Sequence, residues 1–250
     1  MKKEGYDAEF SCAITAASAT VGPIFPPSIP MVIYAMLSGA SIGKLFMGGM
    51  VPGVLLAILL MIYVAFISHK RNYPAGVVMS KREFLKATLQ ALPALFTVVI
   101  LLGGIYSGIC TPTEAGAVAS AYALIISALI YKTLGWKKLW GIIKKSAANT
   151  ATLALLCGTS MLFSYIISLE QVPRVVASLV MGITDNKYIF LFIVNIVFLL
   201  LGCVLDVSTI QLVFVPMVLP LVQAMGIDLV HFGVVICLNM MIGPVSYTHL

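Results

Sequence analysis

The chain has 250 residues, of which 61% are hydrophobic and only 10% are charged, and its mean hydropathy is +1.08. Because soluble domains carry roughly 25% charged residues, this composition excludes an ordinary soluble protein and predicts an all-α polytopic membrane protein, a single transmembrane domain over residues 1–250 in a lipid bilayer. The net charge of +6 would suit a nucleic-acid partner, but the basic residues gather in two connectors, 69–87 and 133–146, and form no groove-binding patch. We therefore expect no nucleic-acid partner.

The first predicted element is an interrupted helix over residues 9–38. Pro23, Pro26, Pro27 and Pro30 fall within this apolar run, and adjacent prolines break a helix because they remove backbone donors and clash with the preceding turn. The carbonyl groups freed by such a break find no partners in lipid. The sequence GPIFPPS therefore predicts either a binding site at the break or a kink between packed helices.

Within this break, Gly22 would allow close backbone approach, Ser28 offers a hydroxyl, and Pro26 and Pro27 leave carbonyls without donors. We expect the half-helix that starts near Ser28 to turn the positive end of its dipole toward an anionic substrate. The hydroxyl residues before the break either line the approach to this site or serve helix packing; they are Thr15, Ser18 and Thr20.

Residues 42–132 are predicted to contain three membrane spans, at 42–68, 88–109 and 114–132. The basic connector 69–87 follows the first span, and the positive-inside rule places it in the cytoplasm. Glu114, in the motif CTPTEAG, is expected in the first turn of the third span, where a carboxylate favours the helix N-terminus. We expect a structural role for this glutamate.

Residues 147–183 are predicted to form a re-entrant hairpin. A span over 147–169 is followed by the polar, proline-containing tip ISLEQVPRVV and by an apolar piece, 175–183, that is too short to cross a bilayer. The alternative is an ordinary span followed by a surface helix. Trp136 and Trp140, before the hairpin, indicate an interfacial helix along the cytoplasmic face.

The last spans are expected within residues 187–245, with a break at 202–206. One helix is predicted over 187–205, followed by a shorter pair over 209–224 and 229–245. Asp206 lies at the break, where it either caps the helix that follows or faces an ion together with backbone carbonyls. The two roles are compatible.

Signatures of catalysis are missing from the sequence. It contains no HExxH or GxGD motif and no Walker loop, and its three histidines are isolated, so we expect no enzymatic activity. The five cysteines have neither metal-ligand nor disulfide spacing and are expected to be packing residues, so no cofactor is predicted. Helices broken within the membrane instead favour an ion transporter of the inverted-repeat type.

Three ordered stretches carry a family resemblance: MKKEGYDAEFSCAITAASATVGPIFPPSIPMVIYAMLSGASIGKLFMGGMVPG, GIYSGICTPTEAGAVASAYAL and LLLGCVLDVSTIQLVFVPMVLPLVQAMGIDLVHFGVVICLNMMIG. They resemble the large membrane subunit of the tripartite ATP-independent periplasmic (TRAP) transporters. The resemblance implies a permease of the bacterial inner membrane, with an elevator-type mechanism, sodium as the coupling ion and an organic acid as substrate, such as a dicarboxylate or a sialic acid. It also implies two partners, a small membrane subunit and a periplasmic substrate-binding protein.

The resemblance further implies roles for particular residues. The GPIFPPS break would belong to an ion and substrate site, and Ser164 or Ser168 would lie near the tip of the hairpin. The stretch from Gly202 to Asp206 would bind sodium through backbone carbonyls, in particular those of Gly202 and Leu205. Gly243 matches the glycine that precedes a second break in the family.

Members of this family are longer than this chain at both ends. We therefore expect an internal fragment that does not transport alone, with a tail at 244–250 that is foreign to the family. The alternatives are a non-transporting or degenerate membrane fragment, and a stand-alone ion-coupled carrier that needs no periplasmic partner.

Overall fold

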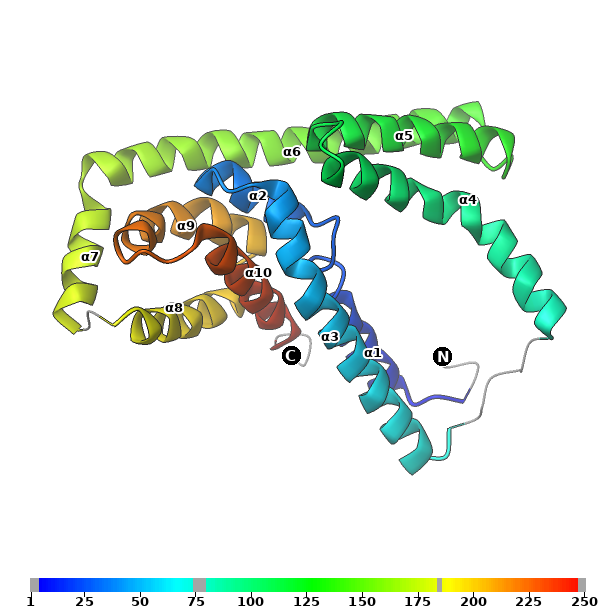
Figure 1. Cartoon of the computed structure of the whole chain (residues 1–250), viewed down its shortest axis with the longest axis horizontal. Helices are drawn as coiled ribbons and strands as arrows, with labels where there is room; N and C mark the ends of the chain where they lie inside the picture. The colour runs from blue at the N-terminus through cyan, green and yellow to red at the C-terminus, as the bar shows by residue number, and fades with distance from the viewer. Residues whose placement is uncertain (1–4, 74–79, 184–185, 247–250) are drawn as a thin grey trace. The chain divides into compact units, whose positions relative to one another are not determined.

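A computed structural model describes residues 5–73, 80–183 and 186–246, and every regular element in these ranges is an α-helix, which confirms the predicted all-α class. The helices in chain order are α1 (Ala8–Ala19), α2 (Ile29–Ser38), α3 (Ile42–Lys70), α4 (Lys81–Tyr106), α5 (Pro112–Leu129), α6 (Trp136–Leu169), α7 (Val172–Ile183), α8 (Lys187–Gly202), α9 (Val207–Ala224) and α10 (Leu229–Ser246) (Figure 1).

The chain divides into two compact units, and the single transmembrane domain over 1–250 stays a prediction. One unit comprises residues 1–74 and 155–250, and the other comprises residues 75–154. The smaller unit is built on α4 and α5, which pack side by side as a hairpin (Figure 1). The larger unit contains α1 to α3, the second half of α6, and α7 to α10. The division arises because α4 and α5 pack mainly against each other.

Five of the described helices are long and apolar enough to cross a membrane, namely α3, α4, α5, α6 and α9. The 29 residues of α3 give a length of about 43 Å at 1.5 Å per residue, more than the hydrocarbon thickness of a bilayer. Large apolar side chains such as Val51, Met61 and Phe66 project outward from it and suit a lipid environment. The predicted polytopic membrane protein is thus confirmed.

Two predicted spans differ from the observed helices. The span expected over 187–205 is α8, which has 16 residues and is about 24 Å long, because the chain turns after Gly202 and Asp206 then caps α9. The span expected over 147–169 begins earlier, at Trp136, so the interfacial segment and the span are one helix of 34 residues, α6. Hydropathy detects membrane depth, and it does not detect whether the backbone stays helical.

Local hydrogen bonds explain where several helices begin. At the start of α5, the backbone N–H of Thr111 donates to Glu114 Oε2 at 2.8 Å, and the N–H of Glu114 donates to Thr111 Oγ1 at 3.3 Å. This reciprocal capping box satisfies two backbone donors that the helix itself leaves free. The structural role expected for Glu114 is therefore confirmed.

The core of the larger unit forms around α2, which packs against α3, α9 and α10. Tyr34 of α2 is fully buried, its hydroxyl donates to the carbonyl of Leu229 at 2.7 Å, and its ring lies 6.5 Å from that of Phe232. A Cβ atom on Gly233 would lie only 2.3 Å from Cε1 of Tyr34. The missing side chain at Gly233 is thus what lets the tyrosine ring lie on α10.

We expect Gly233→Ala to destabilise the larger unit by about 1–3 kcal/mol, because the added methyl group overlaps the buried Tyr34 ring. The measurement is the thermal unfolding midpoint of the purified protein in detergent. Gly158→Ala in α6 is the matched control, because nothing lies within 4 Å of the added Cβ atom. Equal midpoints for the two variants would contradict the packing argument.

Candidate functional site

Residues 20–28 separate α1 from α2 and contain the predicted break. The segment has its own backbone hydrogen bonds. The N–H groups of Ile24 and Phe25 both donate to the carbonyl of Val21, at 3.1 and 2.8 Å. The peptide bond between Pro26 and Pro27 is cis. The break is therefore an ordered turn that redirects the chain between two helices.

Ser28 is the residue that joins the turn to α2. Its side chain is buried, its hydroxyl donates to the carbonyl of Pro23, and its oxygen accepts from the N–H of Met31 at 3.3 Å. The first bond gives a partner to one carbonyl of the proline-rich turn, and the second caps α2. Ser28 therefore has a structural role, and its contact with an ion or substrate stays a prediction.

Two glycines on one face of α3 contact the broken segment, although they were not predicted as site residues from the sequence. A Cβ atom on Gly49 would lie 2.7 Å from the carbonyl oxygen of Ile24, and one on Gly53 would lie 3.2 Å from Cβ of Phe25. Their spacing of four residues is the small-xxx-small pattern of close helix packing in membranes. That spacing is the signal that could have identified this contact.

A cavity of about 530 Å³ lies beside the break. Gly22, Pro26 and Pro27 line it, together with apolar residues of α3 such as Val54 and Ile58, and their role in binding stays a prediction. Every side chain in its lining is apolar, so any polar ligand here would have to bind backbone groups. Ser28 is not among the lining residues.

The second predicted region lies where the ends of α8 and α10 meet. A Cβ atom on Gly243 would lie 2.4 Å from the carbonyl carbon and 2.7 Å from the carbonyl oxygen of Gly202. The two helices are thus in backbone contact, which only glycine at position 243 allows. The structure thus brings together two residues that were predicted as separate parts of the site.

The turn after Gly202 brings a carboxylate close to carbonyls that the turn itself does not use. Asp206 caps α9, because its Oδ2 accepts from the N–H of Ser208 at 2.9 Å. The hydrogen bonds of the turn use carbonyls of α8 before Gly202. Within the described part of the chain, the carbonyls of Gly202 and Leu205 receive no hydrogen bond from this turn. The cap is confirmed, and the ion contact stays a prediction.

Buried amide side chains near this turn were not identified from the sequence. Asn239 of α10 is 8% exposed, and its Nδ2 donates to the carbonyl and to the Oδ1 of Asn195 in α8, at 2.6 and 2.8 Å. Fully buried Gln211 of α9 donates through Nε2 to Sγ of Cys237 at 3.4 Å. The Oε1 of Gln211 and the Oδ1 of Asn239 have no hydrogen-bond partner within the described residues.

Ser164 and Ser168 lie in the last two turns of α6, before the turn at 170–171 that leads into α7. This arrangement of a long helix, a polar turn and a short helix is compatible with both the predicted hairpin at 147–183 and its alternative, a span with a surface helix. Ser164 and Ser168 line neither the cavity beside the break nor the cavity between α8 and α10 that contains Asn195.

Five described helices of spanning length define a polytopic membrane protein, and ordered breaks between shorter helices, such as that between α1 and α2, are typical of transporters. Among the residues described, no group of three or more His, Cys, Asp or Glu side chains could hold a metal ion. Residues 1–246 match the family described as "Tripartite ATP-independent periplasmic transporter, DctM component", and the chain belongs to that family. It is accordingly a multi-pass protein of the inner membrane.

Relatives of known name are similar over nearly the whole chain. The sialic acid TRAP transporter large permease protein SiaM of Vibrio cholerae is 41% identical over 243 residues, which cover 97% of this chain and 57% of the relative. The C4-dicarboxylate TRAP transporter large permease protein DctM of Pseudomonas aeruginosa is 37% identical, over 98% of this chain and 58% of the relative. The isethionate TRAP transporter permease protein DctMQ of Oleidesulfovibrio alaskensis is 38% identical, over 98% of this chain and 39% of the relative. The chain thus spans less than two thirds of the length of these relatives.

Ser28→Ala should lower the free energy of unfolding by about 1–2 kcal/mol, because it removes the cap of α2 and leaves the Pro23 carbonyl without its donor. Thermal unfolding in detergent measures the change. Ser41→Ala is the control: Ser41 caps α3 through a 3.4 Å contact on an exposed side chain, so we expect a loss of only about 0.5 kcal/mol. A smaller loss for Ser28→Ala than for Ser41→Ala would contradict the assigned role.

Gly243→Ala should destabilise the α8–α10 contact by about 1–3 kcal/mol, since backbone atoms cannot move aside as a flexible side chain can. Gly202→Ala is the internal comparison, because its Cβ atom would lie 3.3 Å from Cα of Gly243 and needs only a small adjustment. Thermal unfolding of both variants should show the larger loss for Gly243→Ala. The reverse order would mean that the two helix ends do not meet as described.

Proposed function

We propose that this chain is part of the large permease subunit of a TRAP secondary transporter, which imports an organic anion across the inner membrane with sodium as the coupling ion. The observation that carries the proposal is the match to the DctM component over residues 1–246, which include both interrupted regions. The relatives are permeases, so transport and not catalysis is the proposed activity.

The substrate class follows from the names of the relatives. They are named for sialic acid, C4-dicarboxylate and isethionate, which are all organic anions. A half-helix such as α2 favours an anion near its N-terminus, because the peptide dipoles add there. Ile29 in the first turn of α2 is 66% exposed, whereas the neighbouring Ser28 and Met31 are buried.

The coupling ion is proposed to bind at the turn between α8 and α9. Sodium is a hard cation that takes oxygen ligands, and the carbonyls of Gly202 and Leu205 provide such ligands without competing donors from the turn. The carboxylate of Asp206 at the same turn adds a negative charge. An ion that binds more tightly to one conformation than to the other shifts the equilibrium toward it, and this difference in affinity couples the sodium gradient to uptake.

The proposed partners are a small membrane subunit and a periplasmic protein that delivers the substrate. Because the chain spans little more than half the length of several relatives, uptake is proposed for the complete transporter and not for these residues alone. The corresponding experiment is uptake of a labelled organic acid into proteoliposomes that contain the complete transporter. Uptake that does not change when potassium replaces sodium would contradict the proposed coupling.

Asp206→Asn removes the negative charge at the start of α9 and keeps the helix cap, because asparagine caps helices as well as aspartate does. We expect the variant to keep the thermal midpoint of the parent protein in potassium chloride and to lose the increase that sodium chloride produces, since a bound ion stabilises the folded state. Asp228→Asn is the matched control, because Asp228 also precedes a helix and accepts from the N–H of His231 at 2.8 Å.

The sodium-dependent increase should be the same in Asp228→Asn as in the parent protein. An increase that persists in Asp206→Asn would remove this carboxylate from the proposed site. No sodium-dependent increase in any of the proteins would favour the alternative of a membrane scaffold whose prolines only shape packed helices.

A further inference from the structure

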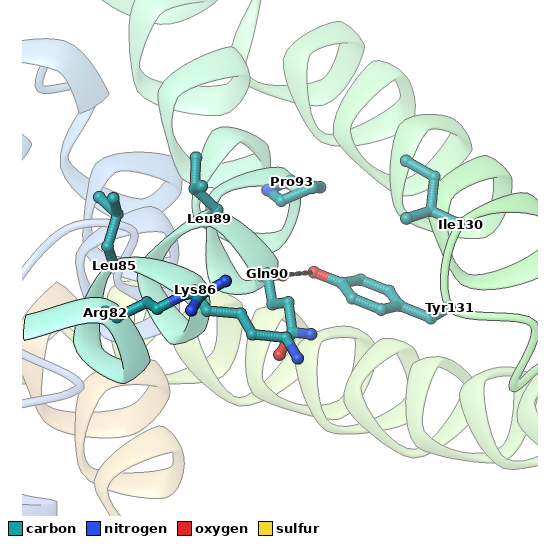
Figure 2. A pocket seen from close by; sticks show the side chains of 8 residues that line it. All are labelled: Arg82, Leu85, Lys86, Leu89, Gln90, Pro93, Ile130 and Tyr131. Atoms are coloured by element: carbon teal, nitrogen blue, oxygen red, sulfur yellow. Dashed lines mark hydrogen bonds between the residues drawn. The ribbon is translucent and has the colours of Figure 1, made fainter. Parts of the chain in front are cut away.

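The smaller unit contains a groove that plays no part in the proposed transport site. It lies between the first turns of α4 and the end of α5 and has a volume of about 730 Å³ (Figure 2). Its lining combines cations, aliphatic side chains and an aromatic ring: Arg82, Leu85, Lys86, Leu89, Gln90, Pro93, Ile130 and Tyr131.

Hydrogen bonds between the two helices fix the walls of this groove. The hydroxyl of Tyr131 donates to the carbonyl of Gln90 at 2.6 Å, as Figure 2 shows, and that of Tyr122 donates to the carbonyl of Pro93 at 3.1 Å. Both acceptors belong to α4 and both donors belong to the following helix or its end. These contacts join the two helices of the hairpin beside the groove.

The charge of the groove is positive. Arg82 and Lys86 lie one helical turn apart on the same face of α4, and both side chains are exposed. Residues 75–154 contain eight lysine and arginine residues and only two acidic ones, Glu83 and Glu114. Glu83 accepts from the N–H of Ser80, and Glu114 caps the opposite end of the hairpin, so neither is among the residues that line the groove.

The apolar side chains that line the groove are exposed enough to contact lipid. Leu85, Leu89 and Ile130 are each about 60% exposed, at 61%, 58% and 58%. Basic residues at the start of α4 and after the end of α5 lie at this same end of the hairpin, and the positive-inside rule places that end at the cytoplasmic face. Anionic phospholipids are concentrated in that leaflet, and basic pockets between helices bind their head groups.

We propose that this groove binds one anionic phospholipid of the cytoplasmic leaflet. Its phosphate lies between Arg82 and Lys86, and an acyl chain runs along Leu85, Leu89 and Ile130. A soluble anion would satisfy the cations and leave the aliphatic wall uncovered, whereas a phospholipid matches both. The proposal does not depend on the transport function.

The test is native mass spectrometry of the purified protein in detergent, titrated with phosphatidylglycerol and, separately, with phosphatidylcholine. We expect one bound phosphatidylglycerol and much weaker binding of phosphatidylcholine. In Arg82→Gln/Lys86→Gln the affinity for phosphatidylglycerol should fall by roughly 25-fold, since each cation near an anionic head group contributes about fivefold. Free glycerol phosphate should not compete at concentrations where the lipid is bound.

The matched control is Lys144→Gln/Lys145→Gln, which removes two exposed cations of the same unit from outside the groove. We expect its affinity for phosphatidylglycerol to change by less than about twofold, because only distant, screened charges are lost. A fall equal to that of Arg82→Gln/Lys86→Gln would show general attraction to a basic surface and would overturn the proposal.

Leu89→Trp tests the aliphatic wall without changing the charge. Leu89 is exposed, so the larger ring should fill the groove without disturbing the fold, and its thermal midpoint verifies this. We expect a loss of phosphatidylglycerol binding of at least roughly fivefold, as a displaced acyl chain gives up buried area. Unchanged binding in this variant, or equal binding of phosphatidylcholine by the parent protein, would overturn the proposal.

Discussion

The burial of α2 is the constraint on which the larger unit depends. This helix has only ten residues, too few to be stable in isolation, so its helical state relies on the contacts around it. Those contacts come from Gly233, which admits the Tyr34 ring, and from Gly49, which admits the broken segment just before α2. Ser28 links the broken segment to α2, because one hydrogen bond joins it to the turn and the other caps the helix. The proline-rich break thus positions a short helix, α2, in the core of the larger unit.

The sequence was informative wherever covalent chemistry limits the backbone. The prolines of GPIFPPS could not lie within a continuous helix, and the Thr111 to Glu114 spacing could hardly serve anything but a helix start. The apolar composition likewise left few choices of fold class. In each case the decisive interaction lies within a few residues along the chain, so it can be read without knowing the tertiary structure.

Contacts between segments that are distant along the chain could not be predicted from the sequence. The approach of Gly202 to Gly243, the amide pair of Asn195 and Asn239, and the division into two units depend on which helix faces which. The continuity of α6 was also missed, because a polar stretch in an apolar chain indicates a membrane boundary and says nothing of a helix end. The site was therefore predicted as separate pieces, of which the structure joins only some.

The short length of α8 has a consequence for the bilayer itself. A helix of about 24 Å that starts at Lys187 falls short of the roughly 30 Å of hydrocarbon, so with the lysine among the head groups the turn at 203–206 lies below the opposite interface. A carboxylate and backbone carbonyls at that depth require surrounding protein, a water-filled cavity or a thinned membrane. The short length of α8 thus sets the depth at which these polar groups must be kept away from lipid.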